Sequence, residues 1–341
     1  MRSQEFYQKH LDRVSRSFAF CIAVLEPPFR EWTSLAYLLC RVLDTVEDSD
    51  WSDLNLRNRQ YSELESYLDE LPEETCVASW KNRFPSSIPE GEKQLLAESW
   101  ALFDDLHGLE NSVRQVMRDT VKRMSAGMRH FSAREIGETG LRLTDLGDVN
   151  RYCYFVAGVV GELLSRLYLL YRPNFDPPPT FLKDAFHFGL FLQKINLLKD
   201  QRRDESESRF LVPDRELLLS SLRANAIGAV SYLTSLPKGE KGFRTFCAWS
   251  LFLGAASLPW LQQSYRQADD SKIPRTVTQE LLKAVQSVCD DNEALRAHLA
   301  EFLTTLPAST PVILADGGLS WFHAIRGSSL EPGALREIGV C

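Results

Sequence analysis

Residues 181–204 read FLKDAFHFGLFLQKINLLKDQRRD, and apolar side chains cover almost every side of the helix that they would form. A helix that is apolar all round is typical of a protein core. At about 100° per residue, one polar line within roughly an 80° arc runs along this helix. The line consists of Gly189, Gln193, Asn196, Asp200 and Asp204. Because buried carboxylates without partners are costly and tend to take up protons, the two aspartates require a cationic partner.

Two kinds of partner fit this polar line. Salt bridges to neighbouring bases are one, and the bases are Lys194, Lys199, Arg202 and Arg203. These four side chains point away from the polar arc, however. A metal ion facing a cavity would explain both the burial and the four-residue spacing. We therefore interpret Asn196, Asp200 and Asp204 as metal-facing groups, and name the whole polar line the second ladder.

A similar stripe ends the segment 33–48, TSLAYLLCRVLDTVED, which we name the first ladder. Tyr37, Arg41, Asp44 and Asp48 fall at i, i+4, i+7 and i+11, opposite the apolar side, and Glu47 lies one turn from Asp44. A solvated face of a surface helix, with a weak pair between Arg41 and Asp44, is one reading. Carboxylates at a helix C-terminus oppose the helix dipole, however. Mg²⁺, which is bound by one or two carboxylates together with substrate phosphates, would offset them.

The remaining chain predicts one all-α domain spanning residues 1–341. Strand signals are poor, and no interdomain linker or long repeat is visible. Helical periodicity recurs in the segments 33–48, 93–107, 112–127, 150–171, 181–204 and 278–304. The segment 245–263 has about the minimum apolar length of a membrane span. Polar residues and a proline interrupt it, so we expect a buried core helix instead.

The net charge, the cysteines and the first residues indicate which partners and which cellular compartment to expect. The net charge of −7 and the lack of a dense basic run argue against a nucleic-acid partner. The seven cysteines form no CxxC pair, and the first residues lack the apolar core of a signal peptide. We therefore expect a cytoplasmic protein without a transmembrane anchor, which touches a bilayer only through its surface.

Together the two ladders predict a trap for magnesium and diphosphate. Metal ions that bridge phosphate oxygens stabilise the charge that develops as diphosphate leaves. The allylic carbocation left behind needs a dry, apolar pocket lined by aromatic rings. The chain has 19 Phe, 10 Tyr and 7 Trp to supply one. Acidic ladders in apolar helices are thus explained by the chemistry of a prenyl diphosphate.

At these residues the sequence resembles the squalene/phytoene synthase family, over about residues 10–280. The two aspartate motifs of the family match DTVED at 44–48 and DQRRD at 200–204. Further matches, in order, are VSRSFAF (14–20), YLLCRVLDTVED (37–48), YCYFVAGVVG (152–161), FLQKINLLKD (191–200) and Arg209 with Phe210 and Pro213. The motifs resemble those of squalene synthases more than those of phytoene synthases.

The resemblance implies an isoprenoid-synthase helical bundle around a central channel, and it assigns roles to residues. Magnesium, or manganese as an alternative, would be held by Asp44, Glu47, Asp48, Asn196, Asp200 and Asp204. The substrate would be bound by Ser15, Arg16, Ser17, Phe18, Tyr37, Arg41, Gln193 and Arg209. Tyr152 matches the tyrosine of the family that assists proton loss. The catalytic residues would therefore be Tyr152, Asp44, Asp48, Asp200 and Asp204.

Periodicity supports the place of Tyr152. A stripe of Tyr152, Val156, Val159 and Leu163 would line the channel, while small residues on the far side would allow close helix packing. These small residues are Gly158, Gly161 and Ser165. The alternative for Tyr152 is a core tyrosine with a satisfied hydroxyl.

The activity implied is the 1′-1 condensation of two farnesyl diphosphates to presqualene diphosphate, followed by reduction with NADPH to squalene. The NADPH residues would be Tyr37, Asn196, Lys272 and Arg275. No GxGxxG fingerprint occurs, so a Rossmann unit is not expected. Where the family has an FCAIPQ-like segment, this chain has FCAWSL (246–251), and its basic stretch has become SKIPRT (271–276).

These departures leave three alternatives open. One is an enzyme that stops at presqualene diphosphate or makes dehydrosqualene or hydroxysqualene. Others are an enzyme that couples a prenyl diphosphate to a different acceptor, and a non-catalytic family member. The complete acidic ladders argue against the last. We expect a monomer.

Overall fold

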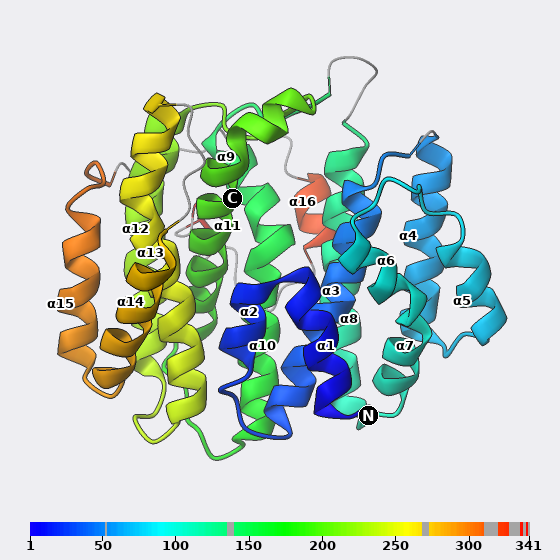
Figure 1. The fold of residues 1–341 in the computed structure, drawn as a ribbon, viewed down its shortest axis with the longest axis horizontal. Coiled ribbons are helices and arrows are strands. Elements are labelled where there is room, and N and C mark those ends of the chain that lie inside the picture. Colours follow the sequence, from blue (N-terminus) through cyan, green and yellow to red (C-terminus); the bar gives the residue numbers. More distant parts are fainter. Residues whose placement is uncertain are drawn as a thin grey trace. The chain divides into compact units, whose positions relative to one another are not determined.

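The computed structural model describes residues 1–51, 53–134, 140–267, 273–309, 320–326, 335, 336 and 339, apart from the side chains of Arg16, Ser320 and 262–267. Helices dominate this part of the chain (Figure 1), which confirms the prediction of an all-α fold. The chain divides into two compact units. The first contains Met1–Ser132 and Arg166–Asn174, and the second contains Ala133–Ser165 and Phe175–Cys341. That the two form a single domain stays a prediction.

The first unit is built around α3 (Phe29–Asp48). Its other helices are α1 (Gln4–Val14), α2 (Arg16–Ile22), α4 (Leu54–Asp69), α5 (Glu74–Lys81), α6 (Glu90–Ala97), α7 (Ser99–His107) and α8 (Asn111–Ser132). The apolar side of α3 is buried, as the sequence predicts, with Leu35, Leu38 and Val46 inaccessible to water. Helices α1, α4, α6, α7 and α8 pack against α3, and so they hold its polar stripe in place.

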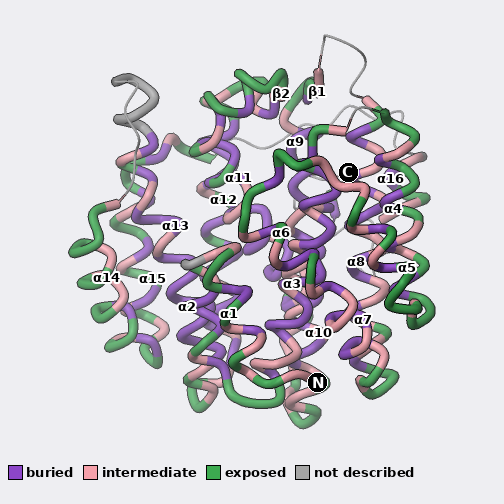
Figure 2. The backbone as a smooth tube through the Cα atoms, turned by 45° about the vertical axis from the view of Figure 1, so that its right-hand side comes forward, coloured by how far each residue is buried: buried purple, intermediate pink, exposed green. Residues whose placement is uncertain are grey.

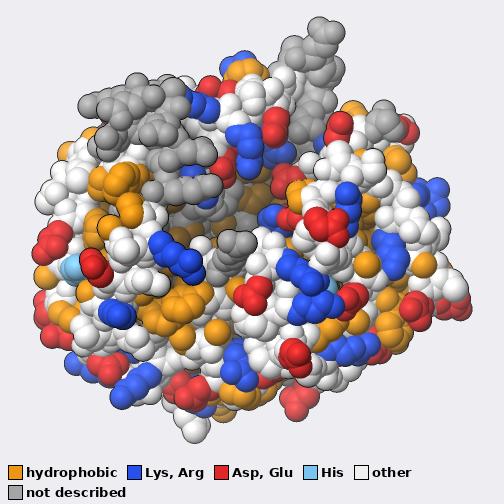
Figure 3. Space-filling view, in the orientation of Figure 1, with side chains coloured by type: hydrophobic (Ala, Val, Ile, Leu, Met, Phe, Trp, Pro, Cys, Tyr) orange, Lys and Arg blue, Asp and Glu red, His pale blue; other side chains and the backbone are white. Residues whose placement is uncertain are grey.

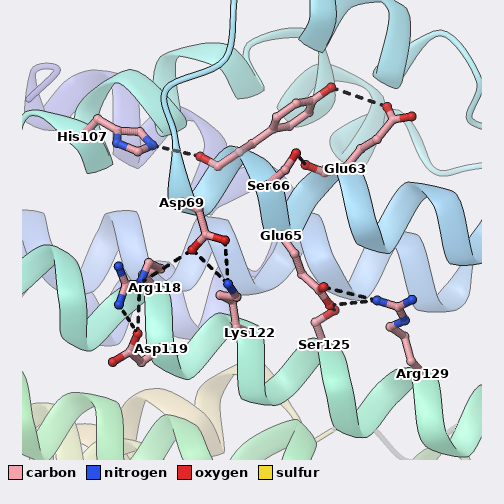
Figure 4. A network of polar contacts seen from close by, with 11 residues as sticks. Glu63, Glu65, Ser66, Asp69, His107, Arg118, Asp119, Lys122, Ser125 and Arg129 are labelled. Atoms are coloured by element: carbon pink, nitrogen blue, oxygen red, sulfur yellow. Dashed lines mark hydrogen bonds and ion pairs between the residues drawn. The ribbon is translucent and has the colours of Figure 1, made fainter.

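A row of polar contacts joins α4 to α8 within this unit (Figure 4). The Glu65 carboxylate accepts hydrogen bonds from the Ser125 hydroxyl at 2.6 Å and from Arg129 at 3.2 Å. One turn further along, Lys122 donates to Asp69 at 2.7 Å. Partly exposed pairs of this kind contribute little stability each. Their spacing at helical intervals fixes how α4 lies along α8.

The second unit is built around α11 (Phe181–Ser206). Its other elements are β1 (Leu141–Arg142), α9 (Leu146–Cys153), the π-helical turn η2 (Tyr154–Gly158), the first part of α10 (Val159–Tyr171), β2 (Arg209–Phe210), α12 (Arg215–Ser235), α13 (Lys241–Gln267), α14 (Arg275–Ser287), α15 (Asn292–Leu303) and α16 (Ser320–Ile325). Helix α11 packs against α12, α13 and η2. Figure 2 shows its largely buried course, which agrees with its apolar sequence.

Glycines bring η2 and α10 close to α11. A Cβ added at Gly161 would lie 2.2 Å from the carbonyl oxygen of Ala185, and one at Gly189 would lie 2.4 Å from that of Ala157. No side chain fits at such distances. The predicted close packing at Gly161 is therefore confirmed. Gly189, which the sequence placed on the polar line, serves this same contact.

The π-helical turn corrects one sequence prediction. A regular helix would carry Tyr152, Val156, Val159 and Leu163 on one stripe. The structure instead has a π-helical turn within this run, which departs from the regular winding that the stripe assumes. Val159 and Leu163 are fully buried and Val156 is half-buried; that they line a channel with Tyr152 stays a prediction.

Two predicted helical segments also differ in detail, and one pair of strands was not predicted. The segment 93–107 is divided between α6 and α7 at Glu98. The segment 278–304 is divided between α14 and α15, because Asp291 caps α15 by accepting hydrogen bonds from the backbone of Glu293 and Ala294. The strands β1 and β2 were not predicted, and they pair in parallel with Leu141 opposite Arg209.

The segment 245–263 lies in α13, and its side chains from Thr245 to Ala256 are mostly buried. This burial agrees with the expected core helix. Among the described residues, one helical run, Leu146–Tyr171, is long and apolar enough to cross a membrane, with a mean hydropathy of 1.5. Buried residues make up 56% of its most apolar window, as in core helices of soluble proteins. On the face shown in Figure 3, acidic and basic side chains are interspersed.

Candidate active site

The first ladder of α3 is assembled around Arg41. Its Nη2 donates a hydrogen bond of 2.6 Å to Oε1 of Glu92, and its Nη1 lies 3.7 Å from Oδ2 of Asp44. Asp48, one turn beyond Asp44, is exposed. The last turn of α3 has no basic residue, and Arg41, one turn earlier, is shared between Asp44 and Glu92, while the helix dipole disfavours carboxylates at this end. This end of α3 therefore favours a cation.

The predicted substrate-binding segment at 14–20 meets the first ladder. Ser15 separates α1 from α2, and its side chain lies beside that of Tyr37. The ring of Phe18 lies 5.4 Å from that of Tyr37. Burial raises the pKa of Tyr37 to about 12, although Ser15 and Arg41 act in the opposite direction. Ser17 is exposed, and the side chain of Arg16 lies outside the described part of the structure.

Asp44 lies in an unusual electrostatic position. Its side chain is 30% exposed, yet protein surrounds it on most sides. Burial raises the pKa of Asp44 to about 7; Arg41 lowers it, and the charges of Asp48 and Glu92 raise it. A nearby cation would displace the proton and stabilise the ionised carboxylate. Such a carboxylate suits a metal ligand.

Glu47 differs in its surroundings from the other acidic residues of the segment. Its side chain is buried. The pKa of Tyr61 on α4 is raised first by the burial of Tyr61 and second by the charge of Glu47. Glu47 therefore lies near the packing between α3 and α4. Its predicted role as a metal ligand stays a prediction.

A recess of about 150 Å³ opens beside the first ladder. Its walls are formed by Arg41, Thr45, Asp48, Ser49, Asp50, Ser87, Ile88, Pro89 and Glu92. No sequence motif indicated Glu92 as a residue of the site. The residue falls between the Pro- and Gly-containing segment 84–91 and the predicted helix 93–107, and it lies 51 positions from its partner Arg41. No local pattern could have connected the two.

The second ladder follows α11 in the second unit. Asn196 is exposed, Asp200 is 33% exposed, and Asp204 is buried. Burial raises the pKa of Asp204 to about 6, against the effect of Arg209 and Arg203. Arg203 lies 3.9 Å from Asp200 and 3.7 Å from Asp204. Because Arg203 is 66% exposed, these long pairs are weak.

Lys194 was the other notable candidate for a salt bridge with these aspartates. It is buried and instead donates hydrogen bonds to Ser221 at 2.9 Å and to Asn225 at 2.7 Å. Burial lowers its pKa to about 8. Lys194 thus joins α11 to α12. Gln193, the neighbouring residue on the polar line, is half-buried.

Tyr152 and Arg209 meet in the second unit. Nη2 of Arg209 donates a hydrogen bond of 3.2 Å to the hydroxyl oxygen of Tyr152, which is 4% exposed. Arg209 owes its position to β2, which pairs with β1 directly after the left-handed Gly140 (φ 64°). Separate sequence motifs had indicated Tyr152 and Arg209. The structure places a cation on the hydroxyl that was expected to manage a proton.

The predicted NADPH residues are only partly placed. Arg275 is exposed at the first position of α14, and Asn196 is exposed on α11. Lys272 lies outside the described residues. Tyr37 belongs to the other unit. That these residues come together stays a prediction, as does the expectation that the two ladders face each other.

The number of carboxylates in each ladder suits magnesium. Within the described ranges, no three His, Cys, Asp or Glu side chains gather closely enough to hold a metal ion. Mg²⁺ commonly takes one or two carboxylates and completes its coordination with water and substrate phosphates. The pairs Asp44 with Asp48 and Asp200 with Asp204 match this requirement. The donor set therefore suits Mg²⁺ bound together with a phosphorylated ligand.

Comparison with known proteins defines the class. Residues 11–232 match the model of the squalene/phytoene synthase family, so the chain belongs to this family, as its motifs predicted. Squalene synthases are among the relatives that it matches. That of Schizosaccharomyces pombe is 31% identical over 278 residues, which are 73% of this chain and 57% of the relative. That of Saccharomyces cerevisiae is 29% identical over 278 residues, 73% and 59% of the two chains.

The chain spans about half the length of the curated relatives that it matches. Solved structures share its fold. The complex of TcSQS with a ligand has a TM-score of 0.72 at 22% identity, and the match covers 98% of both chains. A dehydrosqualene synthase in complex with a ligand has a TM-score of 0.56 at 18% identity, over 83% of this chain and 95% of that one.

Proposed function

We propose that this protein condenses two molecules of farnesyl diphosphate head to head and forms presqualene diphosphate with release of one diphosphate and one proton. The observation that carries the proposal is the pairing of an acidic ladder with an arginine in each unit: Arg41 beside Asp44, and Arg209 beside Asp204. Membership of the squalene/phytoene synthase family, and the squalene synthases among its relatives, support it.

Each ladder would hold diphosphate oxygens. Asp44, Asp48, Asp200 and Asp204 would hold magnesium, which when bound would stabilise the charge of the leaving diphosphate. Arg41 and Arg209 present several N–H donors in a planar fork that suits phosphate oxygens. Tyr37 lies one turn before Arg41, and Ser15 lies beside Tyr37, so both would complete the first phosphate site.

Tyr152 would receive the proton that is lost when the cyclopropane ring closes. Its hydroxyl oxygen accepts a hydrogen bond from Arg209, which fixes the direction of its lone pairs. The hydroxyl would relay the proton: as its oxygen takes up the proton of the carbocation, its own O–H proton would pass to the diphosphate that leaves.

The second half of the proposal is reduction to squalene. NADPH, when bound, would supply the hydride for this reduction. Lys272 and Arg275 would bind the phosphates of NADPH without a Rossmann unit, since cations of this kind pair well with phosphate. Squalene is apolar, so release would take place at a bilayer that the protein contacts only peripherally.

The reductive step has its own test. With NADPH, the purified protein should convert presqualene diphosphate into squalene, and the double variant Lys272→Ala, Arg275→Ala should accumulate presqualene diphosphate while its condensation rate is unchanged. Identical products from the wild-type protein with and without NADPH would show that the reaction ends before reduction. The buried departures at Ser250 and Leu251 would then be the first positions to exchange.

A further inference from the structure

Glu92 is a buried acid that no sequence motif singles out. Its side chain is 9% exposed and accepts the 2.6 Å hydrogen bond from Arg41. It stands at the third position of α6, where the helix dipole favours a negative charge. The arrangement therefore keeps a carboxylate directly against an arginine of the first ladder.

Helix α6 cannot easily move away from this contact. A Cβ added at Gly91 would lie 2.9 Å from the carbonyl oxygen of Arg13, so the backbone of α6 rests directly on the end of α1. Ser15, two residues after Arg13, lies beside Tyr37. The mutually packed helices α1, α3 and α6 thus carry both Glu92 and the proposed phosphate ligands.

Arg41 has two acidic neighbours that compete for it. Glu92 accepts a hydrogen bond from Nη2, whereas the 3.7 Å from Nη1 to Asp44 is too long for one. Nε of Arg41 is buried and has no hydrogen-bond acceptor among the described residues. Glu92 therefore tethers one corner of the guanidinium and leaves Nη1 beside the ladder.

We propose that Glu92 is a positioning residue for Arg41. Its carboxylate holds the guanidinium apart from Asp44, so that Arg41 is free to bind phosphate and Asp44 is free to bind metal. Without this tether, Arg41 closes on Asp44 as an i,i+3 pair, and the ladder loses a phosphate donor and an acidic ligand together. This inference rests on the proposed diphosphate-binding function of the first ladder.

The test is the binding of inorganic diphosphate with Mg²⁺, measured by calorimetry on the full chain. Glu92→Gln keeps the shape and removes the charge, and should weaken binding roughly tenfold, the effect of losing one charge-assisted contact. Glu90→Gln is the matched control, because it removes the same charge from an exposed position of α6 whose partner is Gln94. It should bind like the wild-type protein.

Steady-state kinetics separate positioning from a general structural role. Glu92→Gln should raise KM for farnesyl diphosphate about tenfold and leave kcat within about threefold, since the reacting groups stay intact. Glu92→Asp, which keeps the charge, should recover part of the loss and serves as the test if Glu92→Gln does not fold. Equal diphosphate binding by Glu92→Gln and wild type would overturn the inference, and so would an equal loss in Glu90→Gln. If wild-type protein binds no diphosphate, the proposed function itself fails.

Discussion

Replacing Asp44 by asparagine should stabilise the metal-free protein, and the gain should depend on pH. The folded protein raises the pKa of this carboxyl from its ordinary 3.8 to about 7, first through burial. Between these two pH values the folded state binds more protons than the unfolded state. The free energy of unfolding therefore decreases as the pH rises through this window. Asparagine does not titrate, so the Asp44→Asn variant does not lose this part of its free energy of unfolding as the pH rises.

The size of the effect follows from the two pKa values. Their difference corresponds to about 4 kcal/mol if nothing screens the charge. Asp44 is 30% exposed, however, so water screens part of its charge and we expect about 2 kcal/mol at pH 8. At pH 5 the protein has passed only the lower part of the pH range between the two pKa values. The free energy of unfolding of Asp44→Asn should then exceed that of the wild type by less than about 1 kcal/mol.

Urea unfolding at pH 5 and pH 8 in chelator measures this difference directly. Asp12→Asn is the control, because Asp12 is an exposed carboxylate of α1 whose hydrogen-bond partner is Gln8. The control should show no comparable dependence on pH. If Asp44→Asn is no more stable than wild type at pH 8, or if its advantage is the same at both pH values, the electrostatic account of the first ladder is wrong.

Four further substitutions test the site and the packing. Tyr152→Phe should bind farnesyl diphosphate normally and lose roughly 10²-fold in condensation rate, the usual contribution of acid–base catalysis; a rate within twofold of wild type would make Tyr152 a packing residue. Asp48→Asn and Asp200→Asn should each abolish turnover without loss of helical circular dichroism, because each removes a charged ligand; near-normal turnover of both at saturating Mg²⁺ would exclude the metal assignment. Gly161→Ala should lower the free energy of unfolding by about 1–3 kcal/mol, since its Cβ would meet the Ala185 carbonyl, and an unchanged urea midpoint would contradict the packing.

Local pattern was enough to predict an all-α fold and several of its helices, α3 and α11 among them. The apolar circumference of 181–204 predicted a core helix, and α11 is one. The stripe from Tyr37 to Asp44 was predicted because its residues share one helix. Tyr152 and Arg209 were both selected as well, although only the fold shows their hydrogen bond.

What the sequence could not predict depends on contacts between distant segments. Glu92 and Arg41 are paired through the packing of α6 on α3, and nothing in either segment indicates the other. The π-turn at 154–158 violates the regular winding on which periodicity relies. Strands of two residues, such as β1, are too short for any alternation.

The central claim is that this chain joins two farnesyl diphosphates head to head. It is tested most directly by incubating purified protein with labelled farnesyl diphosphate and Mg²⁺, without NADPH, and identifying the phosphorylated lipid by mass spectrometry. The account predicts presqualene diphosphate, formed in a ratio of one to each diphosphate released, and its absence when Mg²⁺ is chelated. Recovery of unchanged farnesyl diphosphate, or of farnesol alone, from folded protein at saturating Mg²⁺ would contradict it.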